Sequence, residues 1–180
     1  SENSVFVEVD DFRPYLWCDP GDVHVNVPTL IKNLNSALNK ILESKARKKW
    51  GHWLSRKDKS YIVSIEKHKK QSVLGWSPDG QKEFLKITAQ MPQLIPMIRR
   101  LLEDGETFGV KGGTKYVNVN LPGKMMCYES KLPFDLRYMV DKRLAGNQWM
   151  RIHNVKNREE SEKISRCQYE VEVESKDLNP

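Results

Sequence analysis

The chain has 180 residues, of which 38% are hydrophobic and 30% charged, a composition typical of a globular protein with one sizeable core or two small subdomains. The formal net charge of +6 permits a polyanionic partner but does not establish one. No apolar run approaches the roughly 18–20 residues of a membrane span, and no signal peptide opens the chain, so we expect no membrane partner. Cys18, Cys127 and Cys167 are odd in number and far apart, which predicts free thiols in a reducing, intracellular compartment.

The beginning of the chain predicts two extended segments followed by a helix. Val5–Val9 is rich in β-forming residues, and a second extended segment leads into a turn. The aromatic residues of that segment, Tyr15 and Trp17, are expected to lie half-buried in a sheet, with direct base stacking as the less favoured alternative. From 27 to 42 the apolar residues share one stripe of a helix, which Asn26 is expected to cap.

Residues 45–59 combine basic and aromatic side chains. Seven of these fifteen residues are Lys or Arg, and two tryptophans and His52 lie among them. Because cations neutralise phosphates and indole rings stack on unpaired bases, this mixture suits single-stranded nucleic acid. A solvated basic connector, whose tryptophans fold back onto the core, is the alternative. The predicted nucleic-acid-binding residues are Lys45, Arg47, Lys48, Lys49, Trp50, Trp53, Arg56, Lys57 and Lys59.

The middle of the chain predicts an α+β fold with a mainly antiparallel sheet. Strands are expected at 61–65, 84–89 and 116–120, and a helix between the last two starts at Pro92 and ends at Gly105. Together with the earlier elements, the order is strand, helix, strand, strand, helix, strand. This is the ferredoxin-like pattern that RNA-recognition modules also use.

Residues 128–152 form the stretch around which the chain is organised. Ser130 is the expected N-cap of a short helix, and Gly146 is the expected stop signal. The apolar face of this helix is predicted to consist of Leu132, Leu136, Met139, Val140 and Leu144. Residues 154–163 then predict a polar, mobile loop. Residues 167–173 alternate apolar with polar, as an antiparallel strand with one solvated face would.

No metal site or catalytic centre is recognisable in the sequence. The four histidines are scattered, and the cysteines lack the paired spacing of a metal site. Residues 111–114 lack the spacing of a phosphate-binding loop. Adjacent acids such as Asp10 and Asp11 would point to opposite faces of a strand, so they predict no acid–base pair. We therefore expect no cofactor in this chain.

Five short stretches occur in an order that is typical of one protein family. They are the runs 12–17, 72–76, 84–88 (Phe-Leu-Lys-Ile-Thr), 99–105 (Arg-Arg-Leu-Leu-Glu-Asp-Gly) and 128–152. The last run has a Tyr-Glu-Ser start, a Pro-Phe-led helix that reaches Met-Val-Asp, and a Gly-x-x-Trp exit. Together they resemble the N-terminal domain of family B DNA polymerases, particularly the delta-type replicative catalytic subunit. The resemblance covers nearly the whole chain.

The resemblance implies an N-terminal domain that ends before the exonuclease motifs. In this family such a domain combines an RNA-recognition-like unit with an OB-like β subdomain. The βαββαβ core would occupy 12–128. Residues 129–180 would join the first strands in the β-rich subdomain and lead toward an exonuclease domain. The polymerase that contains this domain would be a DNA-directed DNA polymerase with 3′–5′ exonuclease activity that uses Mg²⁺.

The resemblance also implies a function and partners. The domain would be noncatalytic, would contribute to binding of the single-stranded template and the primer–template, and would pack against the exonuclease and polymerase domains of the same chain. Polymerase accessory subunits are further expected partners. The nucleus is the expected location, with a viral replication site as the alternative. A purely structural interdomain scaffold, or a freestanding module that binds single-stranded nucleic acid, remain alternative functions.

Overall fold

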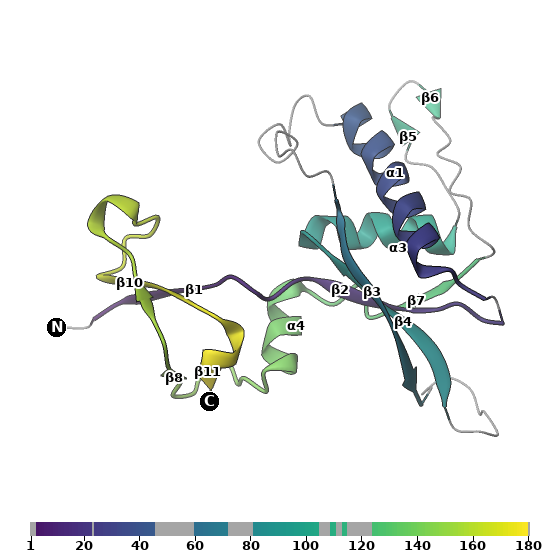
Figure 1. Cartoon of the computed structure of the whole chain (residues 1–180). Helices are drawn as coiled ribbons and strands as arrows, with labels where there is room; N and C mark the ends of the chain where they lie inside the picture. Colours follow the sequence, from purple (N-terminus) through teal and green to yellow (C-terminus); the bar gives the residue numbers. More distant parts are fainter. Residues whose placement is uncertain are drawn as a thin grey trace. The chain divides into compact units, whose positions relative to one another are not determined.

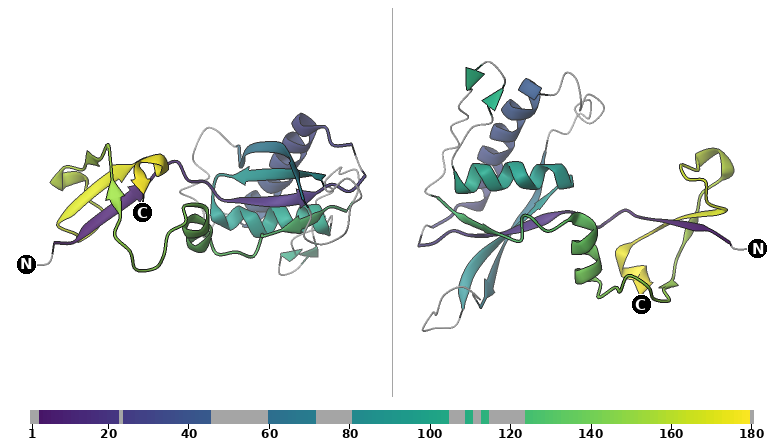
Figure 2. Two further views of the ribbon diagram at one scale, coloured as in Figure 1. Left: turned by 90° about the horizontal axis from the view of Figure 1, so that it is seen from below. Right: turned by 180° about the vertical axis from the view of Figure 1, so that it is seen from behind.

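The computed structural model describes residues 3–22, 24–45, 60–71, 81–104, 109–110, 113–114 and 124–179. The chain divides into two compact units, seen from three sides in Figures 1 and 2. Unit 1 comprises Ser1–Phe12 with Leu132–Pro180, and unit 2 comprises Arg13–Lys131. Helices combine with mostly antiparallel strand pairs, which confirms the predicted α+β class.

Unit 2 is built on a four-stranded antiparallel sheet in the order β3-β4-β2-β7. Along the chain its elements alternate as strand, helix, two strands, helix and final strand, with a short hairpin, β5/β6, before the final strand. Their bounds are β2 Tyr15–Asp19, α1 Val27–Lys45, β3 Ile62–Lys70, β4 Lys82–Ala89, α3 Ile95–Glu103, β5 Gly109–Val110, β6 Gly113–Thr114 and β7 Met126–Tyr128. A 3-10 turn, η1 (Pro92–Leu94), leads into α3, so the predicted proline-led helix is present.

The core of unit 2 lies between the sheet and the two helices, α1 and α3 (Figure 1). Alternate residues of β2, Leu16 and Cys18, are fully buried against the helices, while Tyr15 and Trp17 point to the other side of the sheet and are half-buried. The predicted half-buried position of these two aromatics is therefore confirmed. We call the side of the sheet that faces away from α1 and α3 the outer sheet face.

Two asparagines fix α1, one at its N-terminus and one along its side. The Oδ1 atom of Asn26 accepts a hydrogen bond from the Thr29 backbone N–H at 3.0 Å, which confirms the predicted cap. Asn35 Oδ1 accepts the backbone N–H groups of Tyr61 and Ile62, at 2.8 and 3.1 Å, and so ties α1 to the start of β3. A side-chain acceptor here satisfies donors that the strand ladder leaves open.

Strand β3 is longer than its sequence predicts. It continues through the charged run 66–70, because each of these residues has a partner on β4. Lys67 pairs with Glu83 at 3.0 Å across the two strands. Cross-strand pairing of opposite charges stabilises a strand whose composition resembles a loop. The predicted strand at 116–120 lies outside the described residues.

Two cysteines that are far apart in sequence lie opposite each other in this sheet. Cys18 on β2 and Cys127 on β7 are register partners, and both are free thiols, as is Cys167. A hydrogen bond with the Cys18 thiol, together with burial, raises the pKa of the Cys127 thiol above its usual range. The free thiols agree with the prediction, but the proximity of two of them was not predicted.

Unit 1 contains α4 (Phe134–Asp141) and two small sheets with the strand orders β1-β10-β9 and β11-β8. The strands are β1 Val5–Val9, β8 Arg151–Ile152, β9 Lys156–Asn157, β10 Tyr169–Val173 and β11 Leu178–Asn179, with 3-10 turns η2 Glu160–Glu162 and η3 Ser175–Asp177. β10 pairs in parallel with β1 over five residues and antiparallel with β9 over only two. The prediction that 167–173 forms an antiparallel strand is therefore wrong for the main pairing of β10, which is parallel. Parallel pairing requires a long connection between the two strands, and β1 and β10 come from distant parts of the chain.

The helix α4 differs from its prediction at both ends. Pro133 is the N-cap residue and no side chain caps the helix, so Ser130 does not have the predicted role. The helix ends at Asp141, before Gly146, and Arg143 adopts the left-handed conformation at φ 55° that glycine was expected to supply.

An ion cluster joins three strands or strand ends of unit 1. The Arg158 guanidinium contacts the carboxylates of Glu8, Glu170 and Glu172, with Glu170 at 2.8 Å. Glu170 is buried and also accepts the backbone N–H groups of Ile164 and Ser165. The predicted polar loop at 154–163 thus contains the two-residue strand β9 and the central residue of this cluster, which the sequence did not predict, and its mobility stays a prediction.

Candidate nucleic-acid interface

The outer sheet face of unit 2 carries an aromatic cluster. Strand alternation places Tyr15 and Trp17 on this side of β2, and cross-strand register places Lys86 of β4 opposite Trp17. β3 adds His68 and Lys70 at its far end. The five side chains therefore come from three adjacent strands whose other face is fixed by the buried core.

Two lysines lie over the rings of this cluster. Lys70 Nζ is 3.5 Å from the centroid of the Trp17 ring, and Lys86 Nζ is 4.4 Å from the centroid of Tyr15. Trp17 contacts His68 edge-on, with 5.3 Å between centroids, and Tyr15 at 6.1 Å. Such cation–π pairs contribute on the order of 0.5–1 kcal/mol at exposed sites. This is weak enough for a flexible lysine to exchange a ring for a stronger partner.

A second aromatic pair lies on the same face. Phe84 of β4 and Tyr128 of β7 meet with 6.0 Å between ring centroids and 73° between planes. Tyr128 is also the register partner of Trp17. Aromatic side chains thus occur on β2, β4 and β7 across the width of the outer sheet face.

Carboxylates offset part of the positive charge on this face. Lys82 Nζ donates to Asp19 Oδ2 at 2.8 Å, and this hydrogen bond raises the pKa of Lys82. His68 Nε2 lies 3.1 Å from Glu66 Oε2, and the hydrogen bond from His68 lowers the pKa of Glu66. Among the described residues of this face, Lys70 and Lys86 lie over aromatic rings, while Lys82 is held by a carboxylate.

Rings with adjacent ammonium groups can bind an unpaired strand in two ways at once. A base can stack on an aromatic face, and a lysine can contact the phosphate that follows. Base-paired DNA offers no free base faces, so this arrangement favours single strands. The outer sheet face is the candidate interface.

The predicted binding residues lie almost entirely outside the part of the chain that the structure describes. Lys45 is the last residue of α1. The others, Arg47, Lys48, Lys49, Trp50, Trp53, Arg56, Lys57 and Lys59, fall outside the described residues. Sequence reasoning did not include His68, Lys70 or Lys86. The alternation of Tyr15 and Trp17 with buried residues was the signal that could have led to the face they share.

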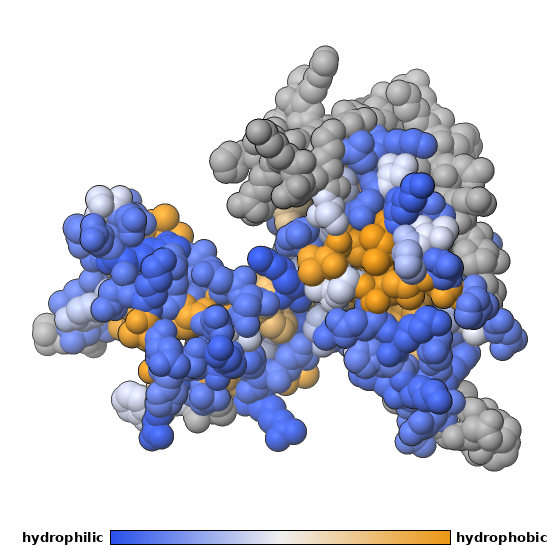
Figure 3. Space-filling view, in the orientation of Figure 1, coloured by the Kyte–Doolittle hydropathy of each residue, from blue (hydrophilic) through white to orange (hydrophobic). Residues whose placement is uncertain are grey.

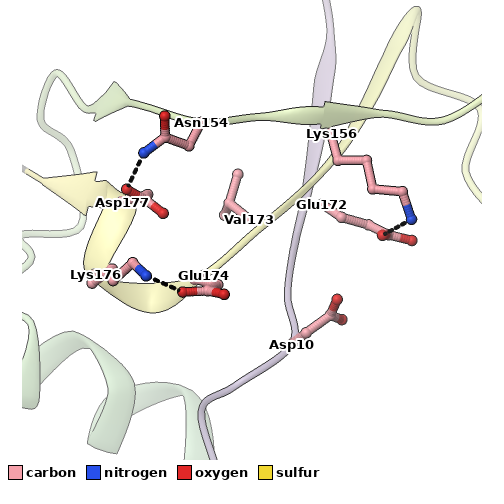
Figure 4. Close-up of a pocket in the computed structure, with 8 residues that line it drawn as sticks. All are labelled: Asp10, Asn154, Lys156, Glu172, Val173, Glu174, Lys176 and Asp177. Carbon is pink, nitrogen blue, oxygen red and sulfur yellow. Dashed lines mark hydrogen bonds and ion pairs between the residues drawn. The ribbon is translucent and has the colours of Figure 1, made fainter.

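Unit 1 contains a pocket of about 340 Å³, shown in Figure 4. Four of its charged side chains form two ion pairs, Lys156 with Glu172 at 3.1 Å and Lys176 with Glu174 at 2.5 Å, and Asp177 accepts a hydrogen bond from Asn154 at 2.8 Å, while Figure 4 draws no such contact for Asp10. Acids that are paired in this way do not present a general acid and base to a substrate. We assign this pocket no catalytic role.

Two absences among the described residues bear on cofactors and membranes. Among these residues, no group of three or more His, Cys, Asp or Glu side chains could hold a metal ion. In the same residues, no helix combines the length and apolar character of a membrane span. In the view of Figure 3 the surface is largely hydrophilic, with apolar side chains in limited areas.

Comparisons with known proteins agree with the motifs. The family model "DNA polymerase delta catalytic subunit-like, N-terminal domain" matches residues 11–96, and the family B DNA polymerase exonuclease domain model matches 125–180. The DNA polymerase delta catalytic subunit of Plasmodium falciparum is 30% identical over 98% of this chain, and that of Dictyostelium discoideum is 27% identical over 95%. The chain spans only 15% and 14% of the lengths of these relatives.

A solved structure has a similar fold. The family B DNA polymerase from the archaeon Pyrobaculum calidifontis aligns with 91% of this chain and 15% of its own, with a TM-score of 0.50 and 19% identity. The chain belongs to the family B DNA polymerases. The part of that family to which it corresponds is the N-terminal region of the delta catalytic subunit, which confirms the resemblance inferred from the motifs.

Proposed function

We propose that this chain is the noncatalytic N-terminal domain of a replicative DNA-directed DNA polymerase and that unit 2 contributes to binding of the single-stranded template. The observation that carries the proposal is the outer sheet face, where Lys70 and Lys86 lie over the rings of Trp17 and Tyr15. Stacked bases and neutralised phosphates together provide affinity for an unpaired strand without requiring a particular sequence. The domain would hold the template while catalysis takes place elsewhere.

We also infer the finer architecture. The element order and antiparallel sheet of unit 2 support a ferredoxin-like unit of the kind that RNA-recognition modules use, in which the sheet face opposite the helices stacks bases. This unit would correspond to the βαββαβ core predicted at 12–128. The assignment of 129–180 with the first strands to an OB-like subdomain stays a prediction.

The basic run at 45–59 would add electrostatic attraction to the same strand. Replacing both Lys48 and Lys49 by alanine should weaken binding to all sequences about equally. The slope of log affinity against log salt should become less steep by about 0.7 for each phosphate that these lysines no longer neutralise. Unchanged affinity and slope would remove this run from the site.

The remaining roles belong to the longer polymerase. The domain would pack against the exonuclease and polymerase domains of the same chain, and accessory subunits would be further partners. Mg²⁺ would serve carboxylates of the catalytic domains, outside these 180 residues. The nucleus is the proposed location, with a viral replication site as the alternative.

The direct test measures fluorescence anisotropy of a labelled single-stranded DNA of about 15 nucleotides with the 180-residue chain. Trp17→Ala should lower affinity roughly 5- to 150-fold, since stacking is worth about 1–3 kcal/mol per base. Trp149→Ala is the matched control, because this indole lies in unit 1 and is 96% exposed. Equal affinity of the Trp17 variant and the wild type would remove the outer sheet face from the interface.

An interdomain scaffold is the second candidate function. It is favoured by the carboxylates of Asp19 and Glu66, which pair with Lys82 and His68 on the same face and reduce its positive potential. A scaffold predicts negligible affinity of the wild-type chain for short single strands at moderate salt. A preference for RNA over DNA of the same sequence would instead support an RNA-binding module.

A further inference from the structure

Two free thiols lie opposite each other on the helix side of the sheet in unit 2. Cys18 on β2 is the register partner of Cys127 on β7, and both side chains pack in the core between the sheet and the helices. Cys18 is fully buried, whereas Cys127 is half-buried. The remaining cysteine, Cys167, belongs to unit 1. The fold therefore brings together two thiols that are far apart in the sequence.

Backbone hydrogen bonds define how closely β2 and β7 approach each other at this pair. The Met125 backbone N–H donates to the carbonyl of Leu102 at 3.0 Å. The Cys127 backbone N–H donates to Glu103 Oε1 at 3.2 Å, so both N–H groups point toward α3 and away from β2. Because N–H directions alternate along a strand, Cys18 and Cys127 occupy a non-hydrogen-bonded position of the ladder, where Cα atoms are about 4.5 Å apart. Disulfides span Cα distances of about 4.4–6.8 Å, so the backbone has the separation that a disulfide needs.

We propose that Cys18 and Cys127 form a reversible disulfide, with a small disulfide of the glutathione type as the oxidant. Cys127 reacts first, because Cys18 has no exposed surface. The Cys127 thiolate attacks one sulfur of the oxidant, whose S–S bond breaks, and one small thiolate leaves. The Cys18 thiolate then attacks the Cys127 sulfur of the mixed disulfide and displaces the second small thiolate. Two electrons pass from the cysteines to the oxidant, and the two cysteine protons end on the two small thiols that are released.

The surroundings of Cys127 make this reaction slow at neutral pH. The contact with Cys18 and burial raise the pKa of the Cys127 thiol, and the Glu103 carboxylate acts in the same direction, with a smaller opposing effect from Arg99. Arg99 is itself paired with Glu103 at 3.2 Å. Only the thiolate is nucleophilic, and here the thiol form predominates. The pair would therefore stay reduced during brief contact with an oxidant and form the disulfide only when the oxidant persists.

A bond between these two residues would constrain most of unit 2. The chain between 18 and 127 contains both core helices and the strands β3 and β4. Closing a loop of this length restricts the unfolded chain, so the oxidised form should be the more stable one. The bond would also join β2 to β7, whose pairing extends over only three residues. The next register pair, Trp17 and Tyr128, lies on the outer sheet face, so oxidation would fix the spacing of two of its rings.

The experiment incubates the 180-residue chain with glutathione disulfide and maps the cross-linked peptides by mass spectrometry without reduction. Three variants are compared with the wild type. Cys167→Ser is the matched control, because it removes the cysteine of unit 1 and keeps the pair, while Cys18→Ala and Cys127→Ser each remove one partner. Circular dichroism of the reduced proteins shows that each variant is folded.

We expect the wild type and Cys167→Ser to form one disulfide, between Cys18 and Cys127, and to form it faster at higher pH. Cys18→Ala should retain glutathione on Cys127, since no second thiol resolves the mixed disulfide, and Cys127→Ser should stay unmodified at the buried Cys18. In Cys167→Ser at a fixed ratio of glutathione disulfide to glutathione, the ratio of disulfide to dithiol should be at least about tenfold higher in the native chain than in urea.

Three results would overturn the inference. They are a mixed disulfide that persists on Cys127 in Cys167→Ser, a link from Cys127 to Cys167 in the wild type in place of the link to Cys18, and a disulfide ratio that is no higher in the native chain than in urea. None of these measurements involves binding of a single strand, so the inference does not rest on the proposed function and can fail without it.

Discussion

The two units of this chain are stabilised in different ways. Unit 2 has an aliphatic core between two helices and a four-stranded sheet, with fully buried residues on each of these elements, such as Leu38, Leu85 and Ile98. The buried core of unit 1 consists of Val171, Val173 and Leu178, with a few half-buried residues around it. Unit 1 relies in addition on the Arg158 ion cluster, which links residues that are far apart in the chain.

The difference shows which unit is suited to act alone. Burial of apolar area is the dominant stabilising term in folding, and unit 2 has much more of it. Unit 1 combines a small core with exposed aliphatic side chains on α4, Leu136 and Val140. The two units should therefore respond differently to core mutations, to ion-pair mutations and to acid.

The largest effect is expected from the core of unit 2. Leu85 is 0% exposed on the central strand β4, and Leu85→Ala should lower the free energy of unfolding of unit 2 by about 2–5 kcal/mol, since it removes buried apolar contacts and leaves a cavity. Denaturant unfolding, monitored by hydrogen exchange, resolves the two units. Val63→Ala, at an exposed position on β3, is the control and should change stability little.

The comparison would fail if Leu85→Ala lowered the stability of both units equally. That result would mean that the two units unfold as one cooperative structure, and the distinction between their cores would have no energetic meaning.

Removing Arg158 should destabilise unit 1 selectively. Arg158→Met leaves the buried carboxylate of Glu170 without its guanidinium partner, and an uncompensated buried charge is strongly unfavourable. We expect the amides of β1 and β10 to lose protection from hydrogen exchange at a lower denaturant concentration than in the wild type, while the protection of β4 is unchanged. In Arg158→Met/Glu170→Gln, which removes both charges, part of the stability should return. No recovery in this double variant would show that the pairing with Glu170 is not what stabilises the unit.

Acid should affect the same cluster. Burial would raise the pKa of Glu170, but hydrogen bonds from Ser165 and Ile164 and from Arg158 outweigh it and lower the pKa to about 2, from an ordinary value of 4.5. The unfolded chain takes up this proton near pH 4.5 and the folded chain only near pH 2. The stabilisation is therefore complete above about pH 4.5 and is lost as the pH falls toward 2.

Acid unfolding of unit 1, followed by hydrogen exchange in β10, measures this loss. In Glu170→Gln the group no longer titrates, so the stability of unit 1 should depend less steeply on pH between about 4.5 and 2. An unchanged pH dependence would assign the acid sensitivity to other carboxylates.

Local patterns predicted much of unit 2 because its elements obey local rules. The stripe of α1, the Asn26 cap and the proline-led start before α3 depend on neighbours within a few residues, and all three are observed. The length of β3 was underestimated because its charged half is stabilised by partners on β4, such as Glu83. The local sequence does not reveal these partners.

The structures of unit 1 and of the outer sheet face depend on contacts between residues that are far apart in the sequence. The parallel contact of β1 with β10 joins the two ends of the chain, and no short pattern specifies it. Helical periodicity identified an apolar face of α4 but not its partner, and Phe12 packs on the other side of the helix, against Tyr138. Likewise, the outer sheet face exists only because register brings Lys70 of β3 to Trp17 of β2.

The smallest expected effect tests the local rule on its own. Asn26→Ala removes the acceptor of the Thr29 backbone N–H and should lower the stability of unit 2 by about 1 kcal/mol, while unit 1 is unchanged. Asn26→Ser keeps a side-chain acceptor at the cap, so it should retain most of the stability. Equal losses in both variants, measured by denaturant unfolding, would mean that the amide of Asn26 stabilises unit 2 through contacts other than the cap. A loss confined to Asn26→Ala would show that unit 2 responds to a single local hydrogen bond independently of the ion cluster that stabilises unit 1.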